Sequence, residues 1–225
     1  QKTELQNQVK ELKAKDIGLF NEKRKQGEND HYICSLIRND QVVDFITYLE
    51  QTNISPSSKI KQSIYETNPL LMKKSSISLL EYSAFFGAQQ IFVYLANKGV
   101  ELTTSIWPYI IHGKNPELIH YLEEKKVNTD KNTYQYLIVE SIKCHHNEIA
   151  EYLLLNFCQK EKIYNQYLLK KYLKYYNYNL KDYSIPQIIE FSLSSDLFYF
   201  FCKYDYSYVV QHLLATPGLN INQQY

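Results

Sequence analysis

The stretch that decides the fold is Ser78-Leu-Leu-Glu-Tyr-Ser-Ala-Phe-Phe-Gly-Ala-Gln-Gln-Ile-Phe-Val-Tyr-Leu95. It contains an apolar helical segment, a turn, and a second apolar helical segment that ends in Tyr-Leu. The same scheme recurs as Ser105-Ile-Trp-Pro-Tyr-Ile-Ile-His-Gly-Lys-Asn-Pro-Glu-Leu-Ile-His-Tyr-Leu122 and as Tyr136-Leu-Ile-Val-Glu-Ser-Ile-Lys-Cys-His-His-Asn-Glu-Ile-Ala-Glu-Tyr-Leu153. The Tyr-Leu pairs begin at Tyr94, Tyr121 and Tyr152, so the scheme returns after 27 and then 31 residues. Self-similarity at this period predicts a pair of helices repeated along the chain.

The scheme extends in both directions from these copies. Residues 197–214 repeat it near the end of the chain. Near the start, one apolar helix face is formed by Val42, Phe45, Ile46 and Leu49. The composition of residues 53–58 is typical of a loop, and the stretch from there to Ser78 predicts one short helix. We therefore predict an all-α repeat domain over 29–222 with roughly five helix pairs, in which 159–195 is a divergent pair.

Several motifs in these copies resemble the ankyrin repeat. Ser78-Leu79-Leu80 is similar to its Thr-Pro-Leu opening, Ser83-Ala84 to its small pair and Gly87 to its inter-helix glycine. His145-His146-Asn147-Glu148-Ile149 resembles its Gly-His-x-Glu-Ile turn, and 214–222 resembles its closing loop. The resemblance implies a helical solenoid that contacts other proteins.

A narrower resemblance covers about residues 28–222. The chain is similar to a divergent ankyrin-like family of unknown function that is expanded in some protist proteomes. The motifs that carry this likeness are Glu81-Tyr-Ser-Ala-Phe-Phe-Gly87, Val100-Glu-Leu-Thr103, His112-Gly113 and Ile142-Lys-Cys-His-His-Asn147. The period is shorter than the usual one of about 33 residues, and most inter-helix glycines are absent. Exact repeat boundaries and the β-hairpins of the repeat therefore stay open.

The physics of stacked helices agrees with the resemblance. A helix pair of this length cannot bury its apolar face alone, so neighbouring pairs share a core. Ser83-Ala84 places small side chains where two helices approach closely, and the alignment of the copies places Trp107 at an inward-facing position. Pro108 falls in the first turn of its helix, where proline costs no hydrogen bond. We also expect the natural protein to continue past residue 225, because an uncapped last repeat exposes apolar surface.

Residues 1–28 differ from the rest of the chain. They are rich in Lys, Glu and Gln, and a 4-3-7 spacing of apolar residues involves Leu5, Val9, Leu12 and Leu19. Asp16 interrupts this seam, which is shorter than the three or four heptads of a secure coiled coil. We predict a polar N-terminal helix, with a coiled-coil remnant as the alternative.

Composition excludes several classes of protein. The chain has 44% apolar and 22% charged residues and a net charge of +1, which gives no electrostatic reason to expect nucleic acid as a partner. No window approaches the ~18 consecutive apolar residues of a membrane span. The four cysteines, Cys34, Cys144, Cys158 and Cys202, are too scattered for a disulfide framework. We therefore expect an intracellular, cytoplasmic protein with no membrane segment.

Metal and catalytic sites are weakly indicated. Cys144-His145-His146, with His112 and His120 one repeat away, is the one cluster that resembles metal ligands. Adjacent residues point in different directions, and the repeat alignment explains both histidines as turn residues, so we expect no metal and no cofactor. Cys34 and Cys202 occupy apolar helix positions that we expect to be buried. Without a phosphate-binding loop or a hydrolase motif, we expect no catalytic activity.

Tyrosines are concentrated between residues 164 and 183, at Tyr164, Tyr167, Tyr172, Tyr175, Tyr176, Tyr178 and Tyr183. Tyrosine among lysines can stack on bases and hold phosphates. However, the chain has 22 tyrosines in all, and Tyr167, Leu168 and Tyr172 fit one face of an amphipathic helix. A divergent repeat helix is the favoured interpretation, and a protein-binding or nucleic-acid-binding surface are the alternatives.

Fold, composition and missing motifs together predict a protein-interaction module or scaffold that is not an enzyme. Loops on one face of a repeat array usually carry the variable contacts. The candidate protein-binding loop residues are therefore Glu101, Thr103, Thr104, Asn128, Asp130, Lys131 and Asn132. The alternative is a self-assembling structural protein, a homo-oligomer formed through the N-terminal helix.

Overall fold

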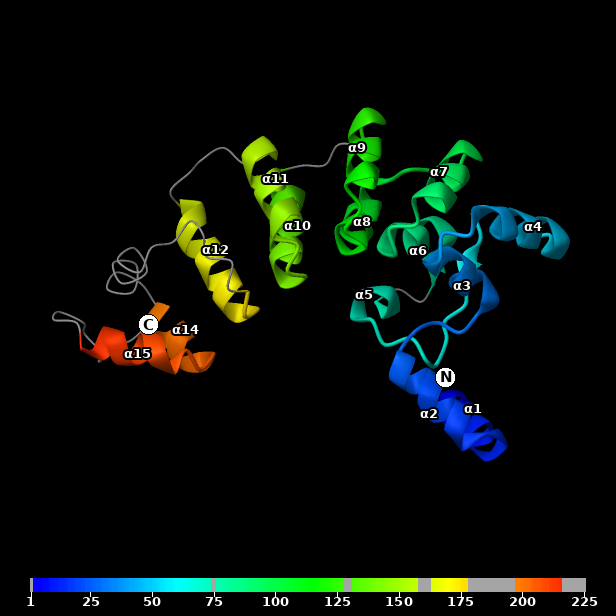
Figure 1. Cartoon of the computed structure of the whole chain (residues 1–225), viewed down its shortest axis with the longest axis horizontal. Helices are drawn as coiled ribbons and strands as arrows, with labels where there is room; N and C mark the ends of the chain where they lie inside the picture. The colour runs from blue at the N-terminus through cyan, green and yellow to red at the C-terminus, as the bar shows by residue number, and fades with distance from the viewer. Residues whose placement is uncertain (1, 74–75, 128–130, 158–162, 178–196, 216–225) are drawn as a thin grey trace. The chain divides into compact units, whose positions relative to one another are not determined.

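The computed structural model describes residues 2–73, 76–127, 131–157, 163–177 and 197–215 (Figure 1). The chain divides into two compact units, residues 1–128 and residues 129–225, and each unit is described by itself. Within the described residues almost all regular structure is helical, and strands are confined to one short hairpin. The predicted all-α class is confirmed.

The first unit contains three successive helix pairs. Each pair consists of two short helices joined by a tight turn: α3 (Tyr32–Arg38) with α4 (Val42–Thr52), α6 (Leu79–Phe85) with α7 (Gln89–Asn97), and α8 (Trp107–Gly113) with α9 (Pro116–Glu124). The first helices of successive pairs lie side by side, α3 against α6 and α6 against α8 (Figure 1). Successive pairs therefore stack on one another, as the shared-core argument requires.

Aromatic side chains connect the second helices of these pairs. The ring of Phe45 on α4 meets Tyr94 on α7 edge to face at 6.3 Å, and Phe92 on α7 meets Tyr121 on α9 in the same way at 5.9 Å. Edge-to-face pairs add to the burial energy of the rings. Tyr94 and Tyr121, which begin the first two Tyr-Leu pairs in the sequence, thus occupy equivalent positions in consecutive pairs.

One backbone geometry recurs in turns of both units. In five of these turns, a residue with a positive φ angle donates its N–H to the carbonyl three residues earlier, while the next N–H bonds to the carbonyl five residues earlier. These residues are Asp40, Gly87, His145, Tyr176 and Asp205. This left-handed motif caps the last carbonyls of a helix and reverses the chain. The helix-turn unit therefore recurs in both parts of the chain, although glycine occupies only one of these five positions.

The prediction of small and inward-facing residues is confirmed. Ser83 and Ala84 on α6 are fully buried, and the ring of Trp107 at the start of α8 is 1% exposed. The indole Nε1 of Trp107 donates to the carbonyl of Val127 at 2.9 Å, so its polar atom is also satisfied. Pro108 lies in the first turn of α8, as predicted.

An insertion separates the first two helix pairs. It contains strand β1 (Lys59–Ile60), the short helix α5 (Pro69–Met72) and strand β2 (Ile77–Ser78). The strands pair antiparallel, Lys59 with Ser78 and Ile60 with Ile77. One short helix was expected here and is found. The hairpin ends at Ser78, whose hydroxyl and backbone N–H form a capping box with Glu81 at the start of α6.

The N-terminal segment corrects the sequence analysis. Instead of one helix, the chain forms α1 (Lys2–Lys15) and α2 (Ile17–Gln26), which contact each other (Figure 1). Asp16, the residue that interrupts the apolar seam, is the N-cap of α2 and accepts a hydrogen bond from the Leu19 N–H at 2.9 Å. A short polar side chain favours a cap over a helix interior, so the break occurs here.

Helix α2 is attached to the insertion directly and through Asp30. Phe20 is buried and its ring lies 5.7 Å from that of Tyr65. Lys23 forms an ion pair at 2.8 Å with Asp30, which also accepts a hydrogen bond from Ser63. Partial burial raises the pKa of Asp30, but the hydrogen bonds from Lys23 and Ser63 oppose it, and the net pKa lies below the ordinary aspartate value.

The second unit contains α10 (Lys131–Lys143) paired with α11 (Asn147–Phe157), then α12 (Ile163–Lys174), and finally α14 (Leu197–Lys203) paired with α15 (Ser207–Leu214). Helix α12 packs against α10 and α14. A small apolar core joins α12, α14 and α15 through Leu169, Leu173, Leu197, Phe201 and Leu213. Residues 159–195 were predicted as a divergent pair, and the described part of that range supplies one helix and its turn.

One burial prediction in this unit is wrong. Cys202 is exposed, because the buried face of α14 runs through Leu197 and Phe201, one helical turn apart, and the next position faces outward. On the helix face proposed for Tyr167, Leu168 and Tyr172, the last two side chains are buried and that of Tyr167 is exposed. Tyr178 and Tyr183, and the closing loop at 216–222, lie outside the described residues.

Candidate functional site

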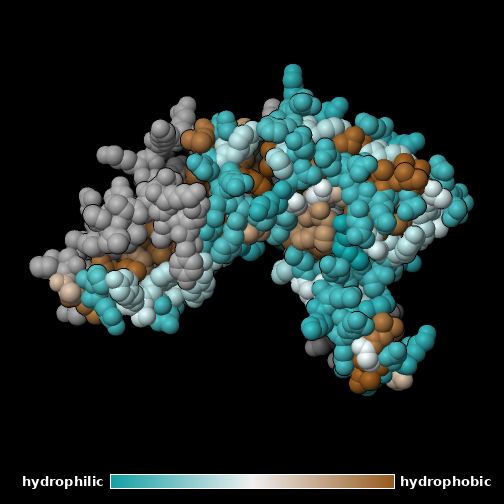
Figure 2. Space-filling view, in the orientation of Figure 1, coloured by the Kyte–Doolittle hydropathy of each residue, from teal (hydrophilic) through white to brown (hydrophobic). Residues whose placement is uncertain are grey.

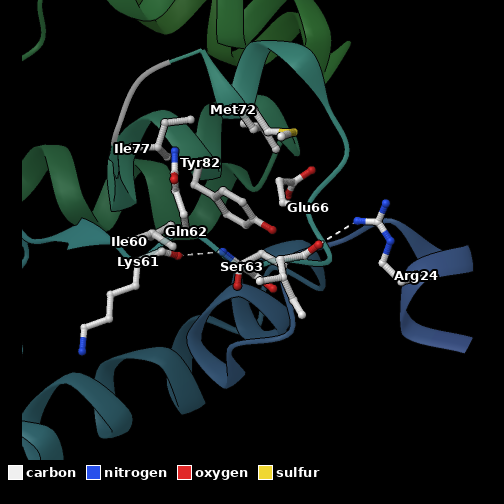
Figure 3. A pocket seen from close by; sticks show the side chains of 12 residues that line it. Arg24, Ile60, Lys61, Gln62, Ser63, Glu66, Met72, Ile77 and Tyr82 are labelled. Carbon is white, nitrogen blue, oxygen red and sulfur yellow. Dashed lines mark hydrogen bonds between the residues drawn. The ribbon is translucent and has the colours of Figure 1, made fainter. Parts of the chain in front are cut away.

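A pocket of about 330 Å³ lies in the first unit, beside the insertion (Figure 3). Its apolar wall consists of Ile60 from β1, Leu71 and Met72 from α5, and Ile77 from β2. The insertion thus builds most of a concave surface beside the helix pairs. A volume of this size lies within the range of small-ligand sites.

Glu66 is the acidic group of this pocket and is 9% exposed. Its Oε1 atom accepts hydrogen bonds from the backbone N–H groups of Thr67 at 3.0 Å and Asn68 at 2.9 Å. Its Oε2 atom is buried and has no hydrogen-bond partner among the described residues. Oε1 therefore shapes the turn, and Oε2 takes no part in it.

Tyr82 supplies the second polar group. Its hydroxyl lies next to Glu66 (Figure 3) and accepts a hydrogen bond from Nη1 of Arg38 at 3.0 Å. Burial raises the pKa of Tyr82 above its ordinary value, with a further rise from the nearby Cys34 and Glu66, so the phenol stays protonated. Arg38 also donates to the carbonyl of Asn29 at 2.8 Å and forms an ion pair with Glu28 at 2.9 Å.

Two hydrogen bonds hold the chain at the edge of the pocket. Nη1 of Arg24 donates to the carbonyl of Ile64 at 2.7 Å, and Nδ2 of Asn29 donates to the carbonyl of Lys61 at 3.0 Å (Figure 3). The side chain of Lys61 extends away from the other labelled residues. The segment 61–64 is thereby fixed between α2 and Asn29, which lies in the link from α2 to α3.

The pocket has no activated nucleophile among the described residues. The thiol of Cys34 contacts this region, but burial raises its pKa to about 12, so the reactive thiolate is not populated at neutral pH. The arrangement can bind a ligand by shape, charge and hydrogen bonding.

The predicted loop residues fall in two places. Glu101, Thr103 and Thr104 are exposed between α7 and α8, and the hydroxyl of Thr103 lies 2.8 Å from that of Ser105. Asn128 and Asp130 lie outside the described residues. Lys131 and Asn132 belong to the first turn of α10. Glu101 and Thr103 thus lie in the loop after α7, and Thr104 begins the 3-10 helix η1 (Thr104–Ile106).

The histidine and cysteine cluster of the sequence has local structural roles. His145 occupies the left-handed turn between α10 and α11, where its Nε2 lies 3.2 Å from the carbonyl oxygen of Tyr175. Burial raises the pKa of Cys144 to about 11. His120 pairs with Glu123 at 3.2 Å, and the ring of His112 stacks on Phe85 at 5.1 Å. The prediction that His145 is a turn residue that satisfies a carbonyl is confirmed.

The pocket was missed by sequence reasoning. Its polar residues, Glu66 and Tyr82, lie 16 residues apart, and the insertion has weak periodicity. One available signal was the Glu66-Thr67-Asn68-Pro69 run, in which an acidic side chain precedes the cap of a proline-initiated helix. That run predicts a turn, and nothing in it predicts that one carboxylate oxygen is buried.

Comparisons with protein-family models, with curated proteins and with solved structures gave no match. Across the described ranges, none of the helices combines the length and apolar character needed to cross a lipid bilayer.

Proposed function

We propose that this chain is an ankyrin-type helical repeat protein that binds another protein and catalyses no reaction. The observation that carries the proposal is the stack of three helix pairs in the first unit, together with the exposed polar loop at Glu101, Thr103 and Thr104. Helix pairs that bury their inner faces on each other leave connecting loops available for contacts. The resemblance of Ser78 to Gly87 to the ankyrin repeat supports the same function, by analogy of fold.

The proposal includes an intracellular, cytoplasmic location. Cys34 is a buried thiol, and Cys202 is an exposed cysteine without a disulfide. Exposed cysteines of this kind persist in a reducing compartment, whereas an oxidising one favours disulfides.

Replacing loop residues should weaken partner binding. A pull-down with the full chain from its native source, analysed by mass spectrometry, identifies the partner. The variants Glu101→Ala, Thr103→Ala and Thr104→Ala are then measured against that partner by calorimetry. We expect the triple variant to bind at least about tenfold more weakly, a loss of ~1.4 kcal/mol, because it removes a charge and two hydroxyls from the contact.

The matched control is Gln89→Ala with Asn97→Ala, two exposed polar residues on α7. These changes leave the loop intact and should not alter the affinity. Wild-type affinity in the triple loop variant would contradict the assignment of this loop.

Self-assembly is a second candidate function, favoured by the N-terminal helices. Leu12, Ile17 and Leu19 are 36%, 61% and 49% exposed, and Figure 2 shows apolar surface at the free end of these helices. Exposed apolar residues that gather on neighbouring helices are typical of a contact surface. The occupant in this hypothesis is the same surface of a second copy.

A triple substitution tests self-assembly without disturbing the fold. Deleting residues 1–28 would remove the buried Phe20 and the Arg24 bond to Ile64, so substitution is the sharper experiment. If the helices drive assembly, light scattering should show an oligomer for wild type and a monomer for Leu12→Gln, Ile17→Gln, Leu19→Gln. A monomeric wild type rejects this function.

A further inference from the structure

The Oε2 atom of Glu66 is a buried acceptor that the described chain leaves unsatisfied. Buried polar atoms in folded proteins nearly always have a hydrogen-bond partner, and a missing partner costs the desolvation energy of the group. Glu66 lines a pocket large enough to admit a ligand. The partner of Oε2 is therefore to be sought among groups that enter this pocket.

We infer that the pocket binds a primary ammonium group carried on a short aliphatic stem. A carboxylate withdrawn from water is stabilised most by a cation at hydrogen-bond distance. Two arginines of this region already have other partners. Arg38 is bonded to Glu28, Asn29 and Tyr82, and Arg24 is bonded to the carbonyl of Ile64. The ligand supplies the missing positive charge.

The hydrogen bonds of Glu66 select an ammonium over a guanidinium. A guanidinium binds best when both carboxylate oxygens accept from its two parallel N–H groups. Oε1 of Glu66 is occupied by the N–H groups of Thr67 and Asn68, so only Oε2 faces the ligand. An ammonium is a compact charge that bonds to one oxygen and directs another N–H to the hydroxyl of Tyr82.

The apolar wall selects the stem. Ile60, Leu71 and Ile77 are buried and offer no hydrogen bonds from their side chains. Methylene groups of an amine stem gain free energy when they cover such a surface while the charged end reaches its partner. Met72 is 53% exposed at the same wall, so the far end of the stem lies where the pocket meets solvent.

This inference goes beyond the proposed function and is independent of it. The pocket residues belong to the insertion and α6, whereas the proposed partner loop lies at 101–104. A chain that binds no ammonium can still bind a protein through its loop. A chain with a defective loop can still bind an amine in the pocket.

Three probes of equal length test the charge requirement. We expect n-butylammonium to cause saturable NMR chemical-shift changes at the amides of Glu66, Thr67 and Tyr82 in the full chain. n-Butanol, which is neutral, and butyrate, which is an anion, should bind at least about tenfold more weakly. Equal binding of all three probes, or none by the ammonium, would overturn the inference and leave ordered water as the partner of Oε2.

Glu66→Gln tests the atom itself. The glutamine oxygen can still accept from Thr67 and Asn68, while an NH₂ group replaces Oε2 and repels the ligand. The affinity for n-butylammonium should fall at least tenfold, with the circular dichroism spectrum unchanged. Unaltered affinity in a folded Glu66→Gln chain would overturn the inference.

A second pair of variants keeps the test decisive if Glu66→Gln does not fold. Met72 is exposed, so Met72→Lys and its neutral match Met72→Gln leave the core intact. The lysine places a competing ammonium at the pocket, so we expect Met72→Lys to bind n-butylammonium at least fivefold more weakly than Met72→Gln. Equal affinities of these two variants would overturn the inference.

Two sources can supply this chemistry, a free small amine or a lysine side chain of a protein. Nα-acetyl-lysine N-methylamide represents the second, and the corresponding norleucine derivative is its neutral match. Tighter binding of the lysine derivative than of n-butylammonium assigns the pocket to a protein lysine. The reverse order assigns it to a free amine.

Discussion

Replacing Trp107 by alanine should lower the free energy of unfolding of the first unit by about 3–5 kcal/mol. Trp107 is among the largest fully buried side chains of the described residues. Its removal leaves a cavity at the start of α8, and the carbonyl of Val127 loses the indole donor. Because neighbouring helix pairs share one core, a cavity in α8 also weakens the packing of α6, which lies against it. Urea unfolding followed by circular dichroism measures the loss.

One variant separates the hydrogen bond of Trp107 from its packing, and a second variant serves as the control. Trp107→Phe keeps a large ring and loses the hydrogen bond, so we expect a smaller loss of about 1–3 kcal/mol from the unsatisfied carbonyl and the reduced volume. Tyr208→Ala removes an exposed aromatic side chain and should change stability by less than ~0.5 kcal/mol. A Trp107→Ala chain as stable as Tyr208→Ala would contradict the inward position of the indole.

Gly113→Ala should destabilise the first unit by about 3 kcal/mol, near the upper end of the usual cost of overpacking. The backbone of Gly113, at the end of α8, lies against the turn that follows α6. An added Cβ would overlap the carbonyl oxygen of Ala84 and would lie 2.9 Å from the backbone nitrogen of Gly87. These are backbone atoms of a rigid turn, so they cannot move aside as a flexible side chain would. Thermal or urea unfolding measures the change.

The same substitution at Gly18 is the matched control. Gly18 lies in the first turn of α2, and its added Cβ meets only the side chain of Asp16, at 3.3 Å. Alanine is a better helix former than glycine, so Gly18→Ala should be neutral or stabilising by up to ~1 kcal/mol. Equal effects of the two substitutions would show that α6 and α8 do not approach as closely as described.

The periodic parts of the fold were predictable because helix pairing is encoded locally. The spacing of Val42, Phe45 and Leu49 places them on one face whatever the neighbours are, and Phe45 and Leu49 are buried as predicted. The alignment of the copies placed Trp107 inside because equivalent positions of a repeat meet equivalent neighbours. The same alignment of the copies placed His145 in a turn. In each case the decisive information lies within about one repeat of sequence.

Predictions failed where a residue's environment depends on a segment far away in the sequence. They also failed where two neighbouring positions of one apolar helix differ in burial. Asp16 divides the N-terminal helix because capping competes with helix continuation, and α2 is then held by Tyr65 far along the chain. Cys202 lies one position beyond the buried face of α14, a difference of about 100° that composition does not reveal. The candidate pocket was missed because its residues come from segments that are far apart in the sequence.

Sequence alone determined that the chain is helical, that its helices come in recurring pairs, and which side of most helices is apolar. These properties follow from short-range spacing, which sets the face on which each side chain emerges. Tertiary structure decided the pocket, because the burial of Glu66 requires α2, the hairpin, α5 and α6 to meet around it. Whether a carboxylate oxygen keeps its water depends on atoms from all these elements, and no single stretch of sequence specifies them.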